Sequence, residues 1–329
     1  MRAPFAVALL FVVSTLAACG DDGSTTGAGG AGGAASGGGG AGGGPAPILD
    51  PSLFDCSRAK DPERTNPIPT DCATDPTCTE RLVSGHRGVG GPLGVMAPED
   101  TVTAVHAAIA LGIDFIETDQ RPTKDGFLVN LHDTSVDRTT DGTGEAADLT
   151  LAQIQAMKLD TARFPGDFSC ERVPTLEEIL TAARGKVHVL IDANKTDRVD
   201  LLVAAIQSTD TVEWAIFDTS SVDKIDQALL LEPSLYTMIR VDSAAQLDEQ
   251  LTHFAAHPPV IVEIGASPAQ MIPAVHAKGH RALSDLFGTD YAAGLDDDPS
   301  LYGAMFDLGL DVGQSDRPDL VLRYLGRFP

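Results

Sequence analysis

The sequence predicts an α/β fold, a (β/α)8 TIM barrel with a β-hairpin and helical insertion after the second strand. From residue 82 onward, short apolar runs alternate with amphipathic helical stretches. One pair of runs lies too close together for parallel neighbours, and 329 residues leave room for the ~250 residues of such a barrel. A hydrophobic fraction of 43% allows a large core and excludes a disordered chain.

Nine short runs of apolar or β-branched residues are candidate strands. The second and third of them are separated by a turn containing Lys124-Asp125-Gly126, which is too short for a parallel crossover. These two therefore form an antiparallel hairpin, and eight strands remain for the barrel. The nine candidates span residues 82–86, 113–119, 127–132, 187–192, 212–217, 235–239, 259–264, 280–285 and 310–315.

Helix signals agree with this alternation. Asp100 stands where an N-cap belongs before a helix over 101–111, and Gly112 stands at its C′ position. Two further amphipathic helices are expected at 148–159 and 174–183. The alternative fold is a doubly wound open sheet, but no G-x-G-x-x-G turn follows the first strand.

The first 47 residues predict export and anchoring. Residues 1–18 have the apolar stretch of a secretory signal, and the ending Leu16-Ala17-Ala18-Cys19 resembles the bacterial lipobox, in which Cys19 is lipidated. An ordinary signal peptide with a chance cysteine is the alternative. Residues 20–44 contain 14 of the 33 glycines, so 19–47 reads as a flexible tether. We expect a protein that is lipid-anchored to a bacterial membrane, on its periplasmic or cell-surface side.

Two further segments follow the tether, a cysteine-containing extension over 48–80 and the barrel domain over 81–329. In an exported chain, four remaining cysteines indicate two disulfides, and three pairings are open. We favour Cys56 with Cys72 and Cys78 with Cys170. A zinc site is the rival interpretation, but the chain has no C-x-x-C pair.

The charge balance excludes a general nucleic-acid binder. Subtracting 47 acidic from 23 basic residues gives −24, and removing residues 1–18, whose one charged residue is Arg2, gives −25. Phosphate backbones are bound by excess Lys and Arg, which this chain lacks.

Polar residues end several of the apolar runs, where the active site of a barrel lies. Glu117 and Asp119 are two apart, so they share one face of a strand and would point inward if Phe115 does. A hard divalent cation, Ca²⁺ or Mg²⁺, would remove their repulsion, whereas a surface-facing acidic pair is the alternative. His86 and His132 also end strands and could act as acid and base near neutral pH. The full set of such residues is His86, Arg87, Glu117, Asp119, His132, Asp133, Asp192, Lys195, Asp316 and Arg317.

Short motifs follow one another in a dense order between residues 82 and 328. They read His86-Arg87-Gly88, Pro98-Glu99-Asp100-Thr101, Glu117-Thr118-Asp119, Thr123-Lys124-Asp125-Gly126, His132-Asp133, Asp137-Arg138-Thr139-Thr140-Asp141-Gly142-Thr143-Gly144 and Ser315-Asp316-Arg317-Pro318-Asp319. In this order they resemble the glycerophosphodiester phosphodiesterase family.

The resemblance implies a barrel enzyme that uses one divalent cation to hydrolyse glycerophosphodiesters to glycerol 3-phosphate and an alcohol. By position, it implies that His86 and His132 are the acid–base pair. It also implies that Arg87 steadies the substrate phosphate and that Glu117 and Asp119 bind the metal.

The third metal ligand of the family is the acid of an acid-x-Lys triplet at the end of the third barrel strand. Here the segment reads Ile191-Asp192-Ala193-Asn194-Lys195, with one residue more. We expect a bulge that turns both Asp192 and Lys195 inward, with Asp192 as metal ligand and Lys195 on the phosphate. Asn194 is the second choice of ligand.

Two other departures leave the substrate class open. The family's late W-T-x-N segment is replaced by Ala282-Leu283-Ser284-Asp285, and Asp100 replaces an Asn but keeps an N-cap residue. A soluble glycerophosphodiester is the expected partner. A phosphodiesterase of lysophospholipids or other lipid phosphodiesters, and an inactive barrel that serves as a binding module, are the alternatives.

Overall fold

The computed structural model describes residues 49–329. The predicted signal peptide, the lipidation site at Cys19 and the tether therefore lie outside the described residues. Within residues 49–329, no helix combines the length and the apolar character that a membrane span requires.

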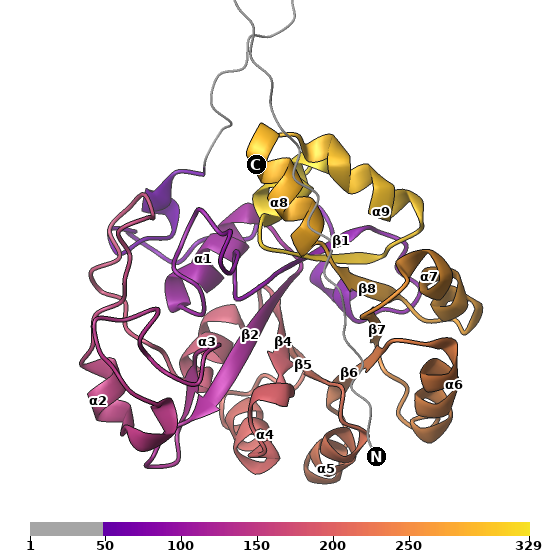
Figure 1. The fold of residues 1–329 in the computed structure, drawn as a ribbon, viewed down its shortest axis with the longest axis horizontal. Coiled ribbons are helices and arrows are strands. Elements are labelled where there is room, and N and C mark those ends of the chain that lie inside the picture. The colour runs from indigo at the N-terminus through magenta and orange to yellow at the C-terminus, as the bar shows by residue number, and fades with distance from the viewer. Residues whose placement is uncertain (1–48) are drawn as a thin grey trace, which may run out of the picture. The chain divides into compact units, whose positions relative to one another are not determined.

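Eight parallel strands form a closed barrel (Figure 1). The order is β1-β9-β8-β7-β6-β5-β4-β2, and β1 also pairs with β2, which closes the ring. β3 pairs antiparallel with β2, as the short turn predicts. All nine predicted strands are confirmed, and they are β1 (Leu82–Gly85), β2 (Phe115–Pro122), β3 (Leu128–Asn130), β4 (His188–Asp192), β5 (Ala215–Thr219), β6 (Tyr236–Val241), β7 (Ile261–Ile264), β8 (Ala282–Asp285) and β9 (Val312–Ser315).

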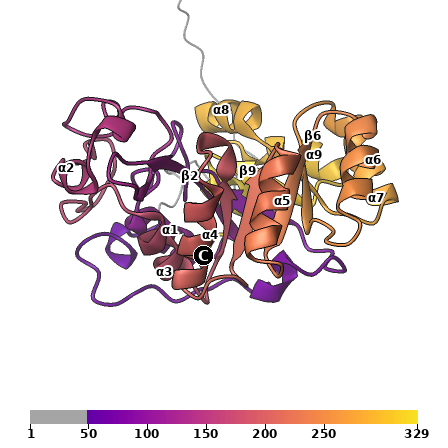
Figure 2. The same cartoon turned by 90° about the horizontal axis from the view of Figure 1, so that it is seen from below.

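Helices surround the barrel, as the view turned by 90° shows (Figure 2). Strands such as β4 and β5 are buried at every position because one face contacts these helices and the other faces the barrel interior. The helices are α1 (Val102–Leu111), α2 (Leu151–Gln155), α3 (Leu176–Ala183), α4 (Val199–Ser208), α5 (Val222–Leu231), α6 (Ala244–His253), α7 (Pro268–Ala277), α8 (Phe287–Asp296), α9 (Gly303–Asp307) and α10 (Pro318–Tyr324).

The start of α1 corrects one prediction. Thr101, rather than Asp100, is the N-cap, and its side chain accepts a hydrogen bond from the amide of Ala104. Asp100 has a left-handed φ of 56°, and its carboxylate turns toward Thr118 of β2. Gly112 ends the helix in the left-handed conformation, as predicted. The helix expected at 148–159 is also shorter, because α2 ends at Gln155.

An apolar layer fills the amino end of the barrel. Residues Ile68 and Ala73 of the 48–80 extension pack against this layer and cover it at the amino end of the barrel. Burial of so many aliphatic and aromatic groups is the main source of stability here. It also leaves the carboxyl end as the part of the interior open to ligands. Each of the eight barrel strands contributes one residue to the layer, namely Leu82, Phe115, Leu190, Ile216, Met238, Ile261, Leu283 and Val312.

Two disulfides form, but the favoured pairing is wrong. Cys56 is bonded to Cys170, and Cys72 is bonded to Cys78. The short turns after residue 70 bring the latter two together, whereas the amide of Cys56 donates a hydrogen bond to the carbonyl of Asp167. This contact joins segments more than 100 residues apart and is not visible in the spacing of the cysteines. All four cysteines are therefore consumed, which leaves none for the rival zinc site.

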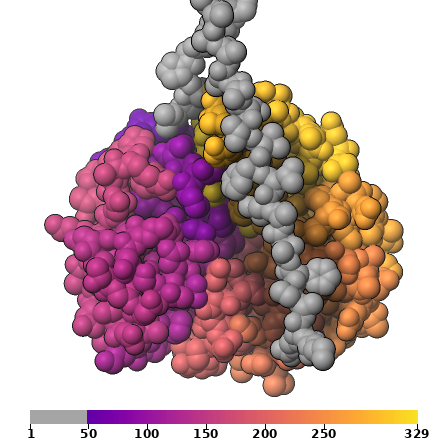
Figure 3. Space-filling view, in the orientation of Figure 1, coloured from indigo at the N-terminus to yellow at the C-terminus, as the bar shows by residue number. Residues whose placement is uncertain are grey.

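The insertion between β3 and α3 forms its own small lobe on one side of the barrel, coloured magenta in the space-filling view (Figure 3). It has a separate hydrophobic cluster that includes Val136, Ile154 and Val173. Its first residues carry His132 and Asp133, so the lobe borders the carboxyl end of β2.

Candidate active site

Three carboxylates meet at the carboxyl end of the barrel. Phe115 points into the interior, and the alternation of β2 therefore places Glu117 and Asp119 inside as well. Asp192 ends β4 and stands directly opposite Asp119 in the strand register. One oxygen from each of Glu117, Asp119 and Asp192 lies within 4.8 Å of the others. We call these three residues the acidic trio.

The environment of the acidic trio suits a cation. Burial, and then the charges of neighbouring carboxylates, raise the pKa of Glu117 well above its usual range, and burial and Asp192 raise that of Asp119. The Oδ2 atom of Asp119 is buried and has no hydrogen-bond partner among the described residues. Three buried carboxylates with an orphaned oxygen fit a hard divalent ion such as Ca²⁺ or Mg²⁺, which prefers oxygen ligands.

His86 follows β1 and faces the acidic trio. Its Nδ1 lies 2.6 Å from Oδ1 of Asp316, and its Nε2 lies 3.8 Å from Oε2 of Glu117. The ring also packs on Phe287, with ring centroids 4.5 Å apart. The carboxylate and the aromatic ring thus fix the imidazole with Nε2 directed at Glu117.

His132 also has its Nδ1 beside a carboxylate, and its other ring nitrogen lies near Lys195. Its Nδ1 lies 2.9 Å from Oδ1 of Asp133, and its Nε2 lies 3.3 Å from Nζ of Lys195. Lys195 Nζ is in turn 3.8 Å from Oδ1 of Asp119. The structure therefore brings both predicted histidines to the acidic trio.

Arg87 is buried between two carboxylates. Its Nη1 donates to Oε1 of Glu99 at 2.9 Å, and its Nε lies 3.5 Å from Oδ2 of Asp119. Its backbone amide donates to Oε2 of Glu117 at 3.0 Å. This arrangement uses a left-handed φ of 51° at Arg87, so the backbone is strained where it touches the acidic trio.

The extra residue after β4 is accommodated by a turn and not by the expected bulge. A 3-10 turn over Ala193–Lys195 follows Asp192, where we expected a β-bulge. The carboxylate of Asp192 accepts hydrogen bonds from the amide and side chain of Asn194, both at 2.7 Å, which stabilises the turn. The turn brings Lys195 back toward Asp119. Asn194 Oδ1 accepts hydrogen bonds from the hydroxyl of Thr219 and the amide of Ser220, so it is not directed at the acidic trio as a metal ligand.

Three residues with clear positions were not assigned roles from the sequence. Asp316 and Asp133 anchor the two histidines, and both already stood among the polar residues at strand ends. Arg121 donates to the carbonyl oxygens of His132 and Lys195, at 2.6 and 3.1 Å, and so ties together the segments that carry them. Nothing in the local pattern of β2 indicates that link, because its partners are backbone atoms distant in sequence.

The sequence matches a known family over most of the barrel. A model of the glycerophosphoryl diester phosphodiesterase family matches residues 86–290. The chain belongs to this family.

A relative in Caldanaerobacter subterraneus, a glycerophosphodiester phosphodiesterase, is 46% identical over 99 residues, which cover 30% of this chain and 38% of that protein. The match to the first curated relatives spans about two fifths of their length, at 43%, 38% and 38%.

Two solved structures share the fold. The glycerophosphoryl diester phosphodiesterase of Parabacteroides distasonis aligns with a TM-score of 0.68 at 22% identity, covering 79% of this chain and 91% of that one. A phosphodiesterase of Oleispira antarctica, solved in complex with the product sn-glycerol-3-phosphate, aligns with a TM-score of 0.62 at 22% identity, covering 75% and 96%. At this identity the likeness shows the fold alone, and it confirms the TIM barrel.

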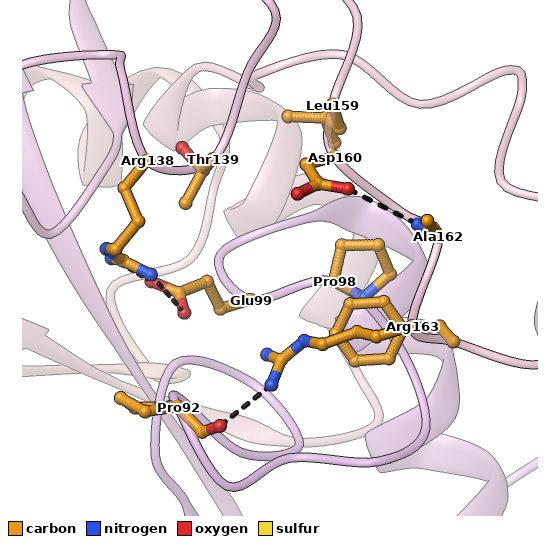
Figure 4. Close-up of a pocket in the computed structure, with 10 residues that line it drawn as sticks. Pro92, Pro98, Glu99, Arg138, Thr139, Leu159, Asp160, Ala162 and Arg163 are labelled. Carbon is orange, nitrogen blue, oxygen red and sulfur yellow. Dashed lines mark hydrogen bonds and ion pairs between the residues drawn. The ribbon is translucent and has the colours of Figure 1, made fainter.

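Two cavities flank the site of this glycerophosphodiester phosphodiesterase family member. The first, of about 390 Å³, lies between the loop after β1 and the insertion (Figure 4). Arg138 pairs there with Glu99, and Arg163 donates to the carbonyl of Pro92 at 2.7 Å. The described residues that line it include neither a histidine nor a member of the acidic trio.

The second cavity, of about 440 Å³, opens over the carboxyl ends of β4 to β7. Its lining includes Asp192 and Lys195, so it is continuous with the acidic trio. A ligand bound at the acidic trio can therefore extend into this cavity, which we call the β4–β7 cavity.

Proposed function

We propose that this protein is a metal-dependent glycerophosphodiester phosphodiesterase that releases glycerol 3-phosphate and an alcohol. The proposal rests on the buried acidic trio, whose three carboxylates are close enough to bind one cation. Two histidines lie near it, and the Nδ1 atom of each contacts a carboxylate. Membership of the family supports the same reaction class.

The acidic trio would hold one divalent cation, and Ca²⁺ and Mg²⁺ both suit its oxygen ligands. The cation would neutralise charge on the phosphodiester, which otherwise repels an attacking oxygen. Arg87 and Lys195 would add positive charge beside the phosphate, because both already lie next to Asp119.

His86 and His132 would move the protons. One imidazole Nε2 takes the proton from the attacking hydroxyl as the new phosphorus–oxygen bond forms. The other donates a proton to the departing alkoxide as the old phosphorus–oxygen bond breaks, so that the alcohol leaves neutral. The carboxylates of Asp316 and Asp133 each accept a hydrogen bond from an Nδ1–H group. They therefore favour the tautomer whose Nε2 is available for the proton transfer. If water attacks, this one step gives glycerol 3-phosphate. If the substrate's own glycerol hydroxyl attacks, the step gives a cyclic phosphate, and water must then break one of its phosphorus–oxygen bonds, with the two histidines exchanging roles, to give glycerol 3-phosphate.

The extra residue between Asp192 and Lys195 raised the alternative of an inactive binding module. The 3-10 turn after Asp192 keeps both Asp192 and Lys195 within the acidic trio's surroundings, so all the required side chain types are present. We therefore prefer the enzyme to the binding module.

The test is product release by the purified protein with Ca²⁺ or Mg²⁺. Glycerophosphocholine and glycerophosphoethanolamine serve as soluble substrates, and lysophosphatidylcholine serves as the lipid alternative. We expect glycerol 3-phosphate from the soluble substrates. Turnover of the lipid alone would move the substrate class to lipid phosphodiesters, and no turnover of any substrate by a folded sample would refute the enzyme.

A further inference from the structure

The β4–β7 cavity contains an unusual balance of charge. Two cationic side chains line it, Lys195 and Arg240 of β6, which are 25% and 26% exposed, and the Arg240 guanidinium contacts Asp218 through both Nε and Nη2. The same guanidinium lies 3.0 Å from Oε2 of Glu263 and 3.5 Å from Oδ2 of Asp192. The Arg240 guanidinium thus faces three carboxylates, and Asp242 adds a fourth to the cavity. Once a cation on the acidic trio has taken up Asp192, the carboxylates of Asp218, Asp242 and Glu263 still outnumber the cations Lys195 and Arg240 by one.

Two buried acceptors in the lining lack donors. Glu263 is 6% exposed, and its buried Oε2 accepts no hydrogen bond from the described residues. Its contact with Arg240 is an ion pair without hydrogen-bond geometry. Gln250 is 9% exposed, and its Oε1 is also without a partner there. Burial and the charge of Asp218 raise the pKa of Glu263 well above its usual range, so a further cation beside it would be stabilising.

The chemistry of the lining selects the kind of cation. Buried acceptors without donors favour a ligand that brings charged N–H groups, since hydrogen bonds to ionised groups are the stronger ones. Quaternary ammonium groups are instead recognised by aromatic cages, and no aromatic residue among 49–329 lines this cavity. A primary ammonium therefore suits the cavity better than a trimethylammonium.

We propose that the β4–β7 cavity binds the ammonium of an ethanolamine-type head group, with Glu263 as its anionic partner. The inference rests on the proposed function, because the head group is the alcohol that hydrolysis releases. Asp192 and Lys195 belong both to this cavity and to the surroundings of the acidic trio, and one guanidinium spans from Asp192 to Glu263.

The test compares kcat/KM for three glycerophosphodiesters, with ethanolamine, choline or glycerol as the alcohol. We expect the ethanolamine substrate to lead by about tenfold in the native protein. Glu263→Gln should remove that lead and leave the other two substrates within about twofold. Glu249→Gln, an exposed glutamate on α6 outside the cavity, is the matched control and should change nothing.

Three results would overturn the inference while leaving the proposed function intact: no ethanolamine preference, a preference that Glu263→Gln does not alter, or an equal loss for all three substrates. If the folded protein hydrolyses none of them, the proposed function has failed instead. Calorimetric titration with phosphoethanolamine then decides the inference alone. Binding stronger than that of inorganic phosphate, and weakened by Glu263→Gln, supports it, and equal binding refutes it.

Discussion

At the scale of single residues, the two histidines depend on their carboxylate partners. Burial acts to raise the pKa of Asp316, but its hydrogen bonds with His86 and with the amides of Gly91 and Leu93 hold the pKa below its usual value. Hydrogen bonding from Arg138 lowers the pKa of Asp133 to about 2. Both carboxylates therefore stay ionised near neutral pH, where they can orient an imidazole and stabilise its protonated form.

Asp316→Asn should lower kcat by about 10- to 100-fold with little change in KM, because the amide no longer fixes the charge and tautomer of His86. Steady-state kinetics over a range of pH is the measurement, and the pH profile should shift. Asp319→Asn is the control, since Asp319 lies in the same segment but pairs with Arg317. A variant with native kcat and an unchanged pH profile would show that Asp316 does not act through His86.

Glu171 gives a pH dependence of stability. Burial raises its pKa from 4.5 to about 7, although amides at the start of α1 oppose the shift. Between these two values the folded protein holds a proton that the unfolded chain has lost, so this group makes the free energy of unfolding decrease as pH rises through the window. The slope is at most about 1.4 kcal/mol per pH unit.

Glu171→Gln should therefore flatten the decline in the free energy of unfolding between about pH 5 and about pH 7, because the amide cannot titrate. Urea denaturation at several pH values, with the metal concentration fixed, gives the comparison. Glu249→Gln serves as the exposed control. Parallel curves for the native protein and Glu171→Gln would contradict this account of the carboxyl.

At the scale of elements, strands and turns differ in how far the sequence determines them. The nine strands were predictable because each is a short buried run between polar segments. The inward position of Glu117 and Asp119 follows from alternation with Phe115. The 3-10 turn at Ala193–Lys195 was not predictable, because the side chain of Asn194 bonds back to Asp192 in a way that strand periodicity does not describe.

The N-cap of α1 shows a related limit. Asp100 and Thr101 are both good capping residues, so local preference does not choose between them. Tertiary contact decides, since the Asp100 carboxylate accepts from Thr118 at 2.9 Å in β2 and leaves the cap to Thr101. The disulfide pairing was missed for the same reason, because the insertion and the extension meet only in the folded chain.

The bond between Cys56 and Cys170 links the extension to the insertion across 114 residues. Cys56→Ser together with Cys170→Ser should lower the free energy of unfolding by about 2–4 kcal/mol, since a long loop regains its entropy in the unfolded chain. Cys72→Ser with Cys78→Ser is the matched control and should cost less, because that bond closes a separation of only six residues. Equal losses in urea denaturation would contradict this ordering.

At the scale of the whole molecule, the barrel has one closed end and one functional end. The extension seals the amino end with apolar side chains, and the acidic trio and both histidines gather at the carboxyl end. We propose in addition that the protein is exported and held at a membrane through lipidated Cys19, which lies outside the described residues.

Cys19→Ser should release the protein from the membrane fraction of the producing cell, since acyl chains contribute ~0.8 kcal/mol of membrane affinity for each buried CH2 group. Fractionation, together with the mass of the first peptide, makes the measurement. Hydrolysis of a soluble substrate should be unchanged in the variant. Retention of Cys19→Ser in the membrane fraction, or an unmodified native cysteine, would contradict lipid anchoring.

Metal-dependent hydrolysis is tested by measuring glycerol 3-phosphate release before chelation, after chelation and after Ca²⁺ or Mg²⁺ is restored. We expect chelation to abolish release and the restored metal to recover it. Glu117→Gln should then need a higher metal concentration, whereas His86→Ala and His132→Ala should still bind the metal but release no product. Undiminished release in the presence of chelator, or by either histidine variant, would contradict metal-dependent acid–base catalysis.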